Sequence, residues 1–317
     1  MNSQDVKNAI SGVLVVDKPV GMTSHDVVQV IRNGTGLRRA GHTGTLDPRA
    51  SGVLVILVGP AVRLSEYVSA SDKRYQAIIR LGSTTDTFDA EGKFTRSNQP
   101  VDVTEAQFEE VLKSFIGEIE QTPPPYSAVK VQGRKAYEMA RQGEEVDLAP
   151  RKIQVHHLEV HLDQVHHLEV LEWAPPEVVV DVHCSSGTYV RSLANDLGEK
   201  LGCGAYLVGL RRTKSGRFSL RDATPLRKLQ EAFTAGNWYQ FLIPAAEALG
   251  DWPAVELSPD EVEAVRHGHR VKVKEGNTEA KVRGVSTQGE LVALMEIATA
   301  EDGSSEWQPR KVFFTSE

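Results

Sequence analysis

The sequence has little cysteine and no long apolar segment. Its 317 residues include two cysteines, Cys184 and Cys203, which are not in a Cys-x-x-Cys arrangement, so neither a disulfide framework nor a zinc site is predicted. The longest apolar run, VLVILV at 53–58, is far too short to cross a bilayer. The first residues, MNSQDVKNAI, lack the basic and apolar regions of a signal peptide. These absences predict a cytoplasmic protein with no membrane segment.

Cofactor motifs are also missing. The sequence contains no Walker A loop, no Gly-x-Gly-x-x-Gly fingerprint and no zinc or flavin signature. It therefore predicts neither a bound cofactor nor a metal. Hydrophobic residues make up 40% of the chain, which is enough for one large packed domain or two unequal ones.

Charge is distributed unevenly along the chain. The formal net charge is −7, which by itself argues against a polyanionic partner. However, residues 205–222 carry five basic residues against Asp222 alone, and residues 266–274 form a second basic run without acids. Six acids lie within residues 101–120. Solvated surface charge explains each cluster, but the segregation also permits RNA binding.

The pattern of caps and apolar spacing predicts both helices and strands. A helix begins near Thr23 or Ser24 and ends by Gly34 and Gly36. Residues 75–81 alternate as a strand, and a Thr-x-x-Gln capping box at residue 104 opens an amphipathic helix. Residues 185–202 predict a further helix, capped by Ser186 or Thr188, with Tyr189 and Arg191 in its first turn.

Two segments interrupt this pattern. Residues 121–152, which include a triple proline and several basic residues, look like an excursion from the core. The hexapeptide VHHLEV occurs at 155–160 and again at 165–170, which indicates a ten-residue tandem duplication. His157, Glu159 and His161 would share one face of a strand, an arrangement that suits a metal, but ordinary surface positions are the better interpretation.

The sequence pattern changes near Trp252. A short capped helix with Pro259 in its first turn is followed by brief strand-like pieces separated by Gly, Asn, Asp and Ser. We therefore expect an α+β fold, with a mixed, mainly antiparallel sheet flanked by helices, in residues 1–250. A small β-rich domain is expected in residues 251–317.

The stretch GHTGTLDPRASGVL, residues 41–54, presents one carboxylate in a rigid setting. Asp47 precedes a proline, which favours an extended backbone, and the glycines allow sharp turns around it. An aspartate with an ordinary pKa of roughly 3.9 is ionised at neutral pH and can act as a nucleophile or base. A structural Asx turn accounts for the same residue. This stretch alone favours the structural interpretation.

Several stretches together resemble, in the same order along the chain, the motifs of the TruB family of tRNA pseudouridine synthases. The stretch around Asp47 resembles the catalytic motif of that family. The others are GVLVVDKPVGMTSHDVV, KRYQAIIRLGSTTDTFDAEG, PPPYSAVKVQGRKAYEMAR, CSSGTYVRSLANDLG and GAYLVGLRRTKSGRF. The segment after Trp252 more loosely resembles a PUA domain, a small RNA-binding β-barrel. The resemblance implies isomerisation of the T-loop uridine at tRNA position 55 to pseudouridine, without a cofactor.

The resemblance also implies catalytic roles. Asp47 would be the essential carboxylate, either attacking the anomeric carbon of the ribose or removing its 2′ proton. Arg191 would pair with Asp47 and keep it ionised and oriented. Tyr75 would stack on the flipped base, with proton transfer as a further role, and Tyr189 would contact the target nucleotide from the opposite wall. His42 would fill the space that the base vacates.

Further residues match positions near the substrate. Lys18, in a structural or a pocket role, and Leu210, as a packing contact, lie near the pocket of the family. Asp89 would hydrogen bond near the target nucleotide or form a turn. The segment 121–152 resembles an insertion that clamps the T-arm. Contacts with the RNA backbone are expected from basic residues of that insertion and of the later basic run, namely Lys130, Arg134, Arg211 and Arg212.

Two other function classes compete with this interpretation. A nucleosidase or glycosidase also places a carboxylate at an anomeric carbon, but glycosidases generally need a second positioned carboxylic acid, and none stands out. A non-catalytic tRNA-binding or folding protein would need only the basic clusters and the C-terminal domain. The chain lacks the long basic extensions of the guide-RNA-dependent relatives, so we expect a monomer that acts on tRNA without a guide RNA or a protein partner.

Overall fold

The structure is a computed structural model of the chain. It describes residues 10–124, 148–160, 175–274, 279–300 and 302–313, together with short stretches between 126 and 144. The second VHHLEV copy and His161 lie outside the described residues. Within the described part, no helix is both long enough and apolar enough to span a membrane.

The contacts between residues divide the chain into two compact units. Unit 1 consists of residues 1–48, 52–69 and 216–317, and unit 2 consists of residues 49–51 and 70–215. This division differs from the expected boundary near residue 250, because the C-terminal residues pack with the first strands of the chain. Whether residues 251–317 fold by themselves stays a prediction.

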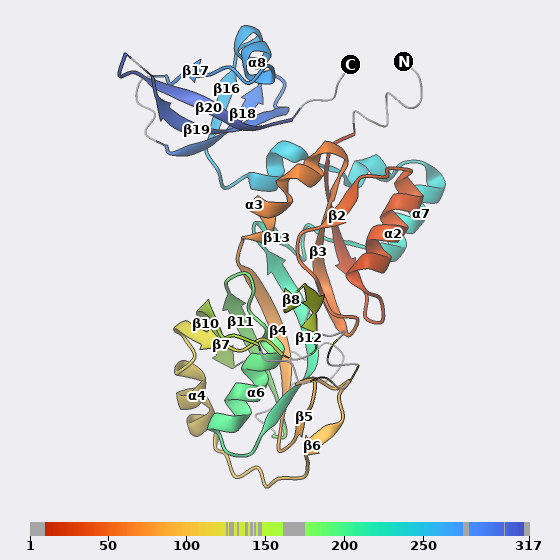
Figure 1. The fold of residues 1–317 in the computed structure, drawn as a ribbon. Coiled ribbons are helices and arrows are strands. Elements are labelled where there is room, and N and C mark those ends of the chain that lie inside the picture. Colours follow the sequence, from red (N-terminus) through yellow and green to blue (C-terminus); the bar gives the residue numbers. More distant parts are fainter. Residues whose placement is uncertain are drawn as a thin grey trace. The chain divides into compact units, whose positions relative to one another are not determined.

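Unit 1 contains a sheet built around its first strand. Strand β1 (Gly12–Lys18) pairs antiparallel with β3 (Ala50–Val58) and parallel with β14 (Thr224–Pro225), while β15 (Ile243–Pro244) pairs with β1 and β2 (Ala40–His42) pairs with β3. The remaining elements of this part are α2 (Ser24–Thr35), η1 (Gly59–Leu64), α3 (Ser65–Ser69), β13 (Phe218–Ser219), α7 (Leu226–Ala235), η2 (Trp238–Phe241) and η3 (Ala245–Leu249). Helices α2 and α7 lie side by side (Figure 1).

The C-terminal residues of unit 1 form a separate five-stranded sheet. Its order is β16-β18-β19-β20-β17, and all pairings except β16 with β18 are antiparallel. The elements are β16 (Ala254–Leu257), α8 (Pro259–Arg266), β17 (Val271–Lys272), β18 (Lys281–Ser286), β19 (Leu291–Thr299) and β20 (Ser305–Val312). The sheet encloses its own apolar cluster around Trp307, while Leu294 and Phe313 belong to the cluster that contains Val13 and Val55.

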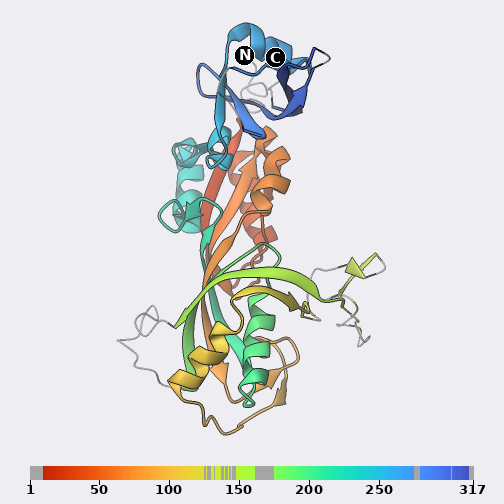
Figure 2. The ribbon, with the colours of Figure 1, turned by 90° about the vertical axis from the view of Figure 1, so that its left-hand side faces the viewer.

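Unit 2 is organised around an antiparallel sheet of the order β12-β4-β11-β10-β7. Its strands are β4 (Lys73–Leu81), β7 (Gly117–Gln121), β10 (Arg151–Val160), β11 (Glu177–Cys184) and β12 (Ala205–Ser215). Figure 2 shows the face of this sheet on which helices α4 (Glu105–Lys113) and α6 (Val190–Lys200) lie. Two small hairpins complete the unit: β5 (Thr84–Thr85) with β6 (Phe94–Arg96), and β8 (Lys130–Val131) with β9 (Arg134–Lys135).

The expected α+β fold with mainly antiparallel sheets is confirmed. The capping box at Thr104 is present, and so is the capped helix that starts after Ser258. Helix α2 begins after its cap, Thr23, and ends at Gly36, whose φ of 70° is the left-handed conformation that glycine adopts without strain.

The cap predicted for α6 is wrong. Tyr189, rather than Ser186 or Thr188, occupies the N-cap position, and no side chain caps the helix there. The amide of Tyr189 donates instead to the side-chain oxygen of Gln121, 2.8 Å away. A partner 68 positions earlier in the chain replaces the local cap that the sequence suggested.

Candidate active site

The loop that carries Asp47 is held through the residues on either side of it. Ser24, the first residue of α2, donates to the carbonyl of Leu46 at 3.0 Å and accepts from the Leu46 amide at 2.8 Å. On the other side, the amide of Gly21 donates to the carbonyl of Pro48 at 2.7 Å. Because the backbone is fixed on both sides, the half-buried Asp47 has a defined place in unit 1.

The side chain of Lys18 contacts both the loop that follows β1 and the loop that carries Asp47. Its side chain is fully buried at the end of β1. The ammonium donates to the carbonyl oxygens of Pro19 at 2.9 Å, Met22 at 2.6 Å and Pro48 at 3.4 Å. A buried charge is tolerated only when polar groups surround it, and these oxygens supply that environment. The geometry favours the structural role among the two that the sequence left open for Lys18.

His42 lies on the same loop as Asp47. It ends β2, where it pairs with Ile56 of β3, and the next residue, Thr43, donates its amide to the carbonyl of Val55 at 3.1 Å. The loop therefore leaves one strand and returns in its neighbour. His42, Asp47 and Lys18 all belong to unit 1.

Asp89 lies in a tight turn of unit 2 and binds Arg191. One carboxylate oxygen accepts from the Thr87 hydroxyl at 2.6 Å and from the Glu91 amide at 2.9 Å. The other oxygen accepts from the guanidinium of Arg191 at 3.1 Å. Asp89 therefore forms the turn that one interpretation predicted, and it also has a cation as a partner. The side chain of Arg191 is 11% exposed and that of Asp89 is 14% exposed, so water screens this ion pair only partly.

The same turn depends on a glycine. A Cβ at Gly92 would lie 2.3 Å from the Thr87 hydroxyl oxygen and 2.4 Å from a carboxylate oxygen of Asp86. Any other residue would push apart the groups that hold the loop, since Asp86 also accepts from the amide of Lys93 at 2.8 Å. A glycine at position 92 is therefore needed for the turn in which Asp89 binds Arg191.

The start of α6 positions Arg191 and Tyr189 together. Gln121, which is 2% exposed, accepts from the Tyr189 amide at 2.8 Å and donates to its carbonyl at 3.1 Å. Arg191 donates a second hydrogen bond to the carbonyl of Tyr126 at 3.2 Å. Sequence reasoning did not identify Gln121, because a glutamine before a proline-rich segment carries no signal of a partner so distant in the chain.

The paired strands β4 and β12 carry four of the predicted site residues, namely Tyr75, Leu210, Arg211 and Arg212. Tyr75 pairs with Arg212, and Leu210 pairs with Ala77 two positions along β4. Tyr75 is 8% exposed and Leu210 is half-buried. Arg212 is 2% exposed, and its predicted contact with an RNA phosphate stays a prediction. Arg211, whose side chain points to the other face, is half-buried.

A second buried lysine lies on the Tyr75 strand. Lys73, two residues before Tyr75 and on the same face, is 6% exposed and donates to the carbonyl of Ser71. Burial and the nearby Arg212 guanidinium lower its pKa to about 8. Cys184, the strand partner of Lys73, is fully buried, and burial raises the pKa of its thiol to about 11. A thiol with so high a pKa is a poor nucleophile.

The hairpin β8–β9 carries the two basic residues predicted for the clamp. Arg134 makes a two-pronged ion pair with Glu144, with distances of 2.9 and 2.7 Å, and a hydrogen bond to Gln142 at 2.8 Å. That hydrogen-bonded pair lowers the pKa of Glu144. Lys130 begins β8, and its side chain lies outside the described residues.

Two family models match consecutive parts of the chain. Residues 32–190 match the N-terminal domain of the TruB family pseudouridylate synthases, and residues 191–249 match the C-terminal domain of tRNA pseudouridylate synthase B. The chain belongs to the TruB family. The resemblance carried by the ordered motifs is thereby confirmed.

Relatives over nearly the full length support this membership. The tRNA pseudouridine synthase B of Thiobacillus denitrificans is 42% identical over 290 residues, which cover 92% of this chain and 93% of the relative. The enzyme of the same name from Heliobacterium modesticaldum is 40% identical over 306 residues, or 96% of each chain. This TruB chain therefore spans almost the whole length of these relatives.

Solved structures share the fold. One chain in a crystal structure of a Cbf5-Nop10-Gar1 complex is 29% identical, with a TM-score of 0.71, and the match covers 98% of this chain and 87% of that chain. A chain from an H/ACA RNP bound to a substrate RNA containing 2′-deoxyuridine is 27% identical, with a TM-score of 0.70 over 99% of this chain and 88% of that chain. The pseudouridine synthase fold of the TruB chain is confirmed.

The predicted site of this TruB family member is divided between the two units. Unit 1 contributes Lys18, His42 and Asp47, and unit 2 contributes the other described site residues. The structure shows Arg191 with Asp89 as an ion-pair partner, which the sequence did not predict. Because Asp47 and Arg191 belong to different units, their pairing stays a prediction.

Proposed function

We propose that this chain isomerises uridine to pseudouridine at position 55 in the T-loop of tRNA. The observation that carries the proposal is the match of residues 32–249 to the TruB family, within which Asp47 lies on a loop fixed at both neighbouring residues. A catalytic carboxylate must be held close to its productive geometry, and an anchored loop achieves this.

In the proposed reaction, Asp47 begins the cleavage of the N-glycosidic bond of a flipped uridine. It either attacks the anomeric carbon or removes the 2′ proton. The base then turns, and a carbon of the ring forms the new C-glycosidic bond. No atom is gained or lost, so no cofactor is required. Flipping costs a few kcal/mol, which stacking on Tyr75 and contacts with Tyr189 and His42 offset.

Arg191 and Asp89 have complementary parts in this proposal. Arg191 pairs with Asp47 and keeps it ionised, as an opposite charge at short range does. Asp89 holds one terminal nitrogen of the guanidinium through the 3.1 Å contact, and the Tyr126 carbonyl holds the other. Asp89 is thus a positioning residue for Arg191, while Leu210 packs at the edge of the pocket.

The tRNA is held by basic residues around the site. Lys130 and Arg134 of the insertion and Arg211 of β12 contact phosphates of the T-arm. Arg134 exchanges its partner Glu144 for a phosphate when RNA binds, since both offer paired oxygens to the guanidinium fork. The C-terminal sheet, in the manner of a PUA domain, adds contacts through the basic residues 266–274.

We further propose that the chain acts in the cytoplasm as a monomer, without a guide RNA or a protein partner. The observation in favour is its similarity along almost the whole length to bacterial enzymes named for tRNA. The structural neighbours in H/ACA complexes make the addition of such components a test: stimulation by a guide RNA would contradict this part of the proposal.

The decisive experiment maps pseudouridine in an unmodified tRNA transcript by carbodiimide modification and primer extension. The native chain should produce a stop in the T-loop without added cofactor or metal. Asp47→Ala should lower the rate by at least about a thousandfold, as removal of an essential catalytic group does. Asp102→Ala, which changes an exposed aspartate outside the site, should retain full activity.

Other outcomes select the competing functions. Binding of tRNA without any stop, with the native chain and both variants behaving alike, would support a non-catalytic RNA-binding protein. Release of free uracil would indicate a nucleosidase.

A further inference from the structure

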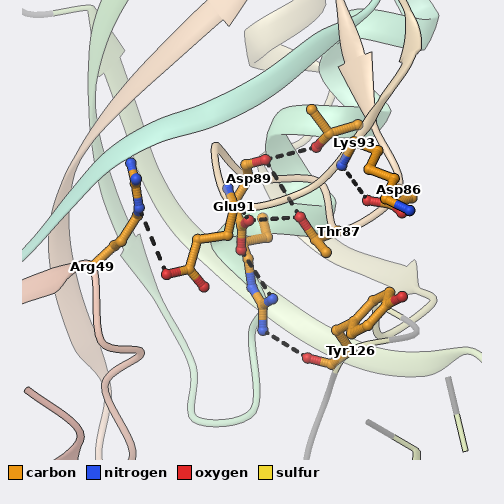
Figure 3. Close-up of polar contacts among 9 residues, drawn as sticks. Arg49, Asp86, Thr87, Asp89, Glu91, Lys93 and Tyr126 are labelled. Atoms are coloured by element: carbon orange, nitrogen blue, oxygen red, sulfur yellow. Dashed lines mark hydrogen bonds and ion pairs between the residues drawn. The ribbon is translucent and has the colours of Figure 1, made fainter. Parts of the chain in front are cut away.

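An exposed ion pair, formed by Arg49 and Glu91, lies beside the Asp89 turn. The Nε atom of Arg49 lies 3.6 Å from a carboxylate oxygen of Glu91, and the two side chains are 57% and 50% exposed. Figure 3 shows this pair next to the Asp89 and Thr87 contacts. Exposed pairs of this kind contribute little to stability, so a structural role is a weak explanation for this pair.

Both residues stand on fixed backbone. Arg49 follows Pro48, whose carbonyl is bound by Gly21 and Lys18, and precedes Ala50, which is buried at the start of β3. Glu91 donates its amide to Asp89 at 2.9 Å. The backbone at both residues is therefore fixed, and the guanidinium and the carboxylate move only by rotation within their own side chains.

The sequence puts Arg49 within reach of the substrate backbone. Its α-carbon is two residues from that of Asp47, so the two lie at most about 7 Å apart. If Asp47 acts at the ribose of the target uridine, the phosphates that flank this ribose come close to Asp47. A flexible, exposed guanidinium at that distance can reach one of them.

We propose that Arg49 is a phosphate-binding residue for the nucleotide at the site, and that Glu91 holds it in place until RNA binds. On binding, Arg49 leaves the carboxylate of Glu91 and contacts a phosphate that flanks the target uridine. Glu91 then faces a polyanion without a partner, so it opposes binding. This inference rests on the proposed function, because it assumes that Asp47 touches the ribose.

Opposite effects of the two residues distinguish this role from a structural one. Arg49→Gln should weaken the binding of unmodified tRNA about three- to tenfold at moderate salt, the range expected for losing one such contact. It should also reduce the slope of log K against log salt concentration by about 0.7 to 0.9, the loss of one phosphate contact. Glu91→Gln should tighten binding up to about fivefold.

The matched control is the pair Arg80 and Glu177, which has similar exposure, 47% and 46%, and a separation of 3.2 Å. Arg80→Gln and Glu177→Gln should leave both the affinity and its salt slope unchanged. Binding is measured by filter retention across a KCl series, and thermal melting verifies that each variant is folded. The double variant Arg49→Gln/Glu91→Gln should bind with the reduced slope of Arg49→Gln.

The results separate failure of this inference from failure of the proposed function. If the native chain forms pseudouridine but Arg49→Gln retains the native affinity and slope, the inference is wrong and the proposed function stands. If Arg49→Gln and Glu91→Gln weaken binding alike, the pair is structural and the inference is also wrong. Absence of pseudouridine with the native chain overturns the proposed function itself.

Discussion

The loop around Asp47 and the turn around Asp89 are both rich in Gly and Thr, and each presents an aspartate, but different groups hold them. The first is fixed by Ser24, Gly21 and the buried ammonium of Lys18, which bind backbone atoms of Leu46 and Pro48. The second is fixed by its own carboxylates, which bind backbone amides, the Thr87 hydroxyl and Arg191.

The difference shows two ways to build a site from the same residue types. In the first loop, the support comes from residues earlier in the chain, so a change in the support acts on Asp47 through the backbone. In the second, Asp89 both forms the turn and holds the cation, so one substitution acts on shape and charge together. Substitutions in the supports should therefore affect stability in the first case and turnover in the second.

The largest expected effect is on stability, from Lys18→Met. The change removes the ammonium that binds three carbonyl oxygens, of which that of Pro48 keeps the Gly21 amide as a donor, and should lower the free energy of unfolding by about 4 kcal/mol. Urea denaturation measures it. The control, Lys200→Met, removes an exposed ammonium that donates to Ser114 at 3.0 Å and should cost less than about 1 kcal/mol. Equal losses would show that Lys18 is no special anchor.

Lys73→Met provides a contrast to Lys18→Met, because the ammonium of Lys73 is buried beside the guanidinium of Arg212. The pKa of Lys73 falls from 10.5 to about 8 on folding, so the folded chain binds fewer protons between these values. The free energy of unfolding therefore rises with pH between about pH 8 and pH 10.5. Below pH 8 the folded chain bears the full cost of burying the charged ammonium. The stability difference between Lys73→Met and the native chain should change by about 3 kcal/mol between pH 7 and pH 10.5, with the variant relatively more stable at pH 7.

That result is read from denaturation curves at several pH values. A difference that does not vary with pH would mean that Lys73 titrates alike in the folded and unfolded chains.

The smallest of the three effects in free energy is expected for Asp89→Asn. The amide keeps the shape of the turn but removes the charge that holds Arg191, so kcat should fall about 10- to 100-fold while the unfolding midpoint moves little. Single-turnover kinetics on the tRNA transcript measure this. Asp86→Asn, in the same turn but bound to the Lys93 amide, should stay within about threefold of the native rate. Equal losses for the two variants would make the effect one of loop shape alone.

Local signals in the sequence were enough for much of the fold. The capping boxes at Thr104 and Ser258 and the end of α2 at Gly36 are formed by neighbours in the chain, so spacing predicts them. The cap of α6 failed because its partner, Gln121, is distant in sequence. Contacts of this kind depend on the completed sheet, which no local pattern describes.

The site residues show the same limit. The ordered motifs identified Asp47, Asp89 and Arg191, but not the contact between the last two, which joins positions 102 residues apart. The adjacent arginines of β12 looked alike in a basic run, whereas a strand sends neighbouring side chains to opposite faces. The burial of Arg212 follows from that alternation together with the packing of the sheet, and only the structure supplies the latter.

The division of the chain into units also determines when each can fold during synthesis. Unit 2 is almost continuous, from residue 70 to residue 215 together with three earlier residues, so it can fold while later segments are still being translated. Unit 1 needs Leu294 and Phe313 in the same cluster as Val13 and Val55. Its first strands must therefore leave the ribosome long before their packing partners exist, and we expect this apolar surface to be the part of the nascent chain that chaperones bind.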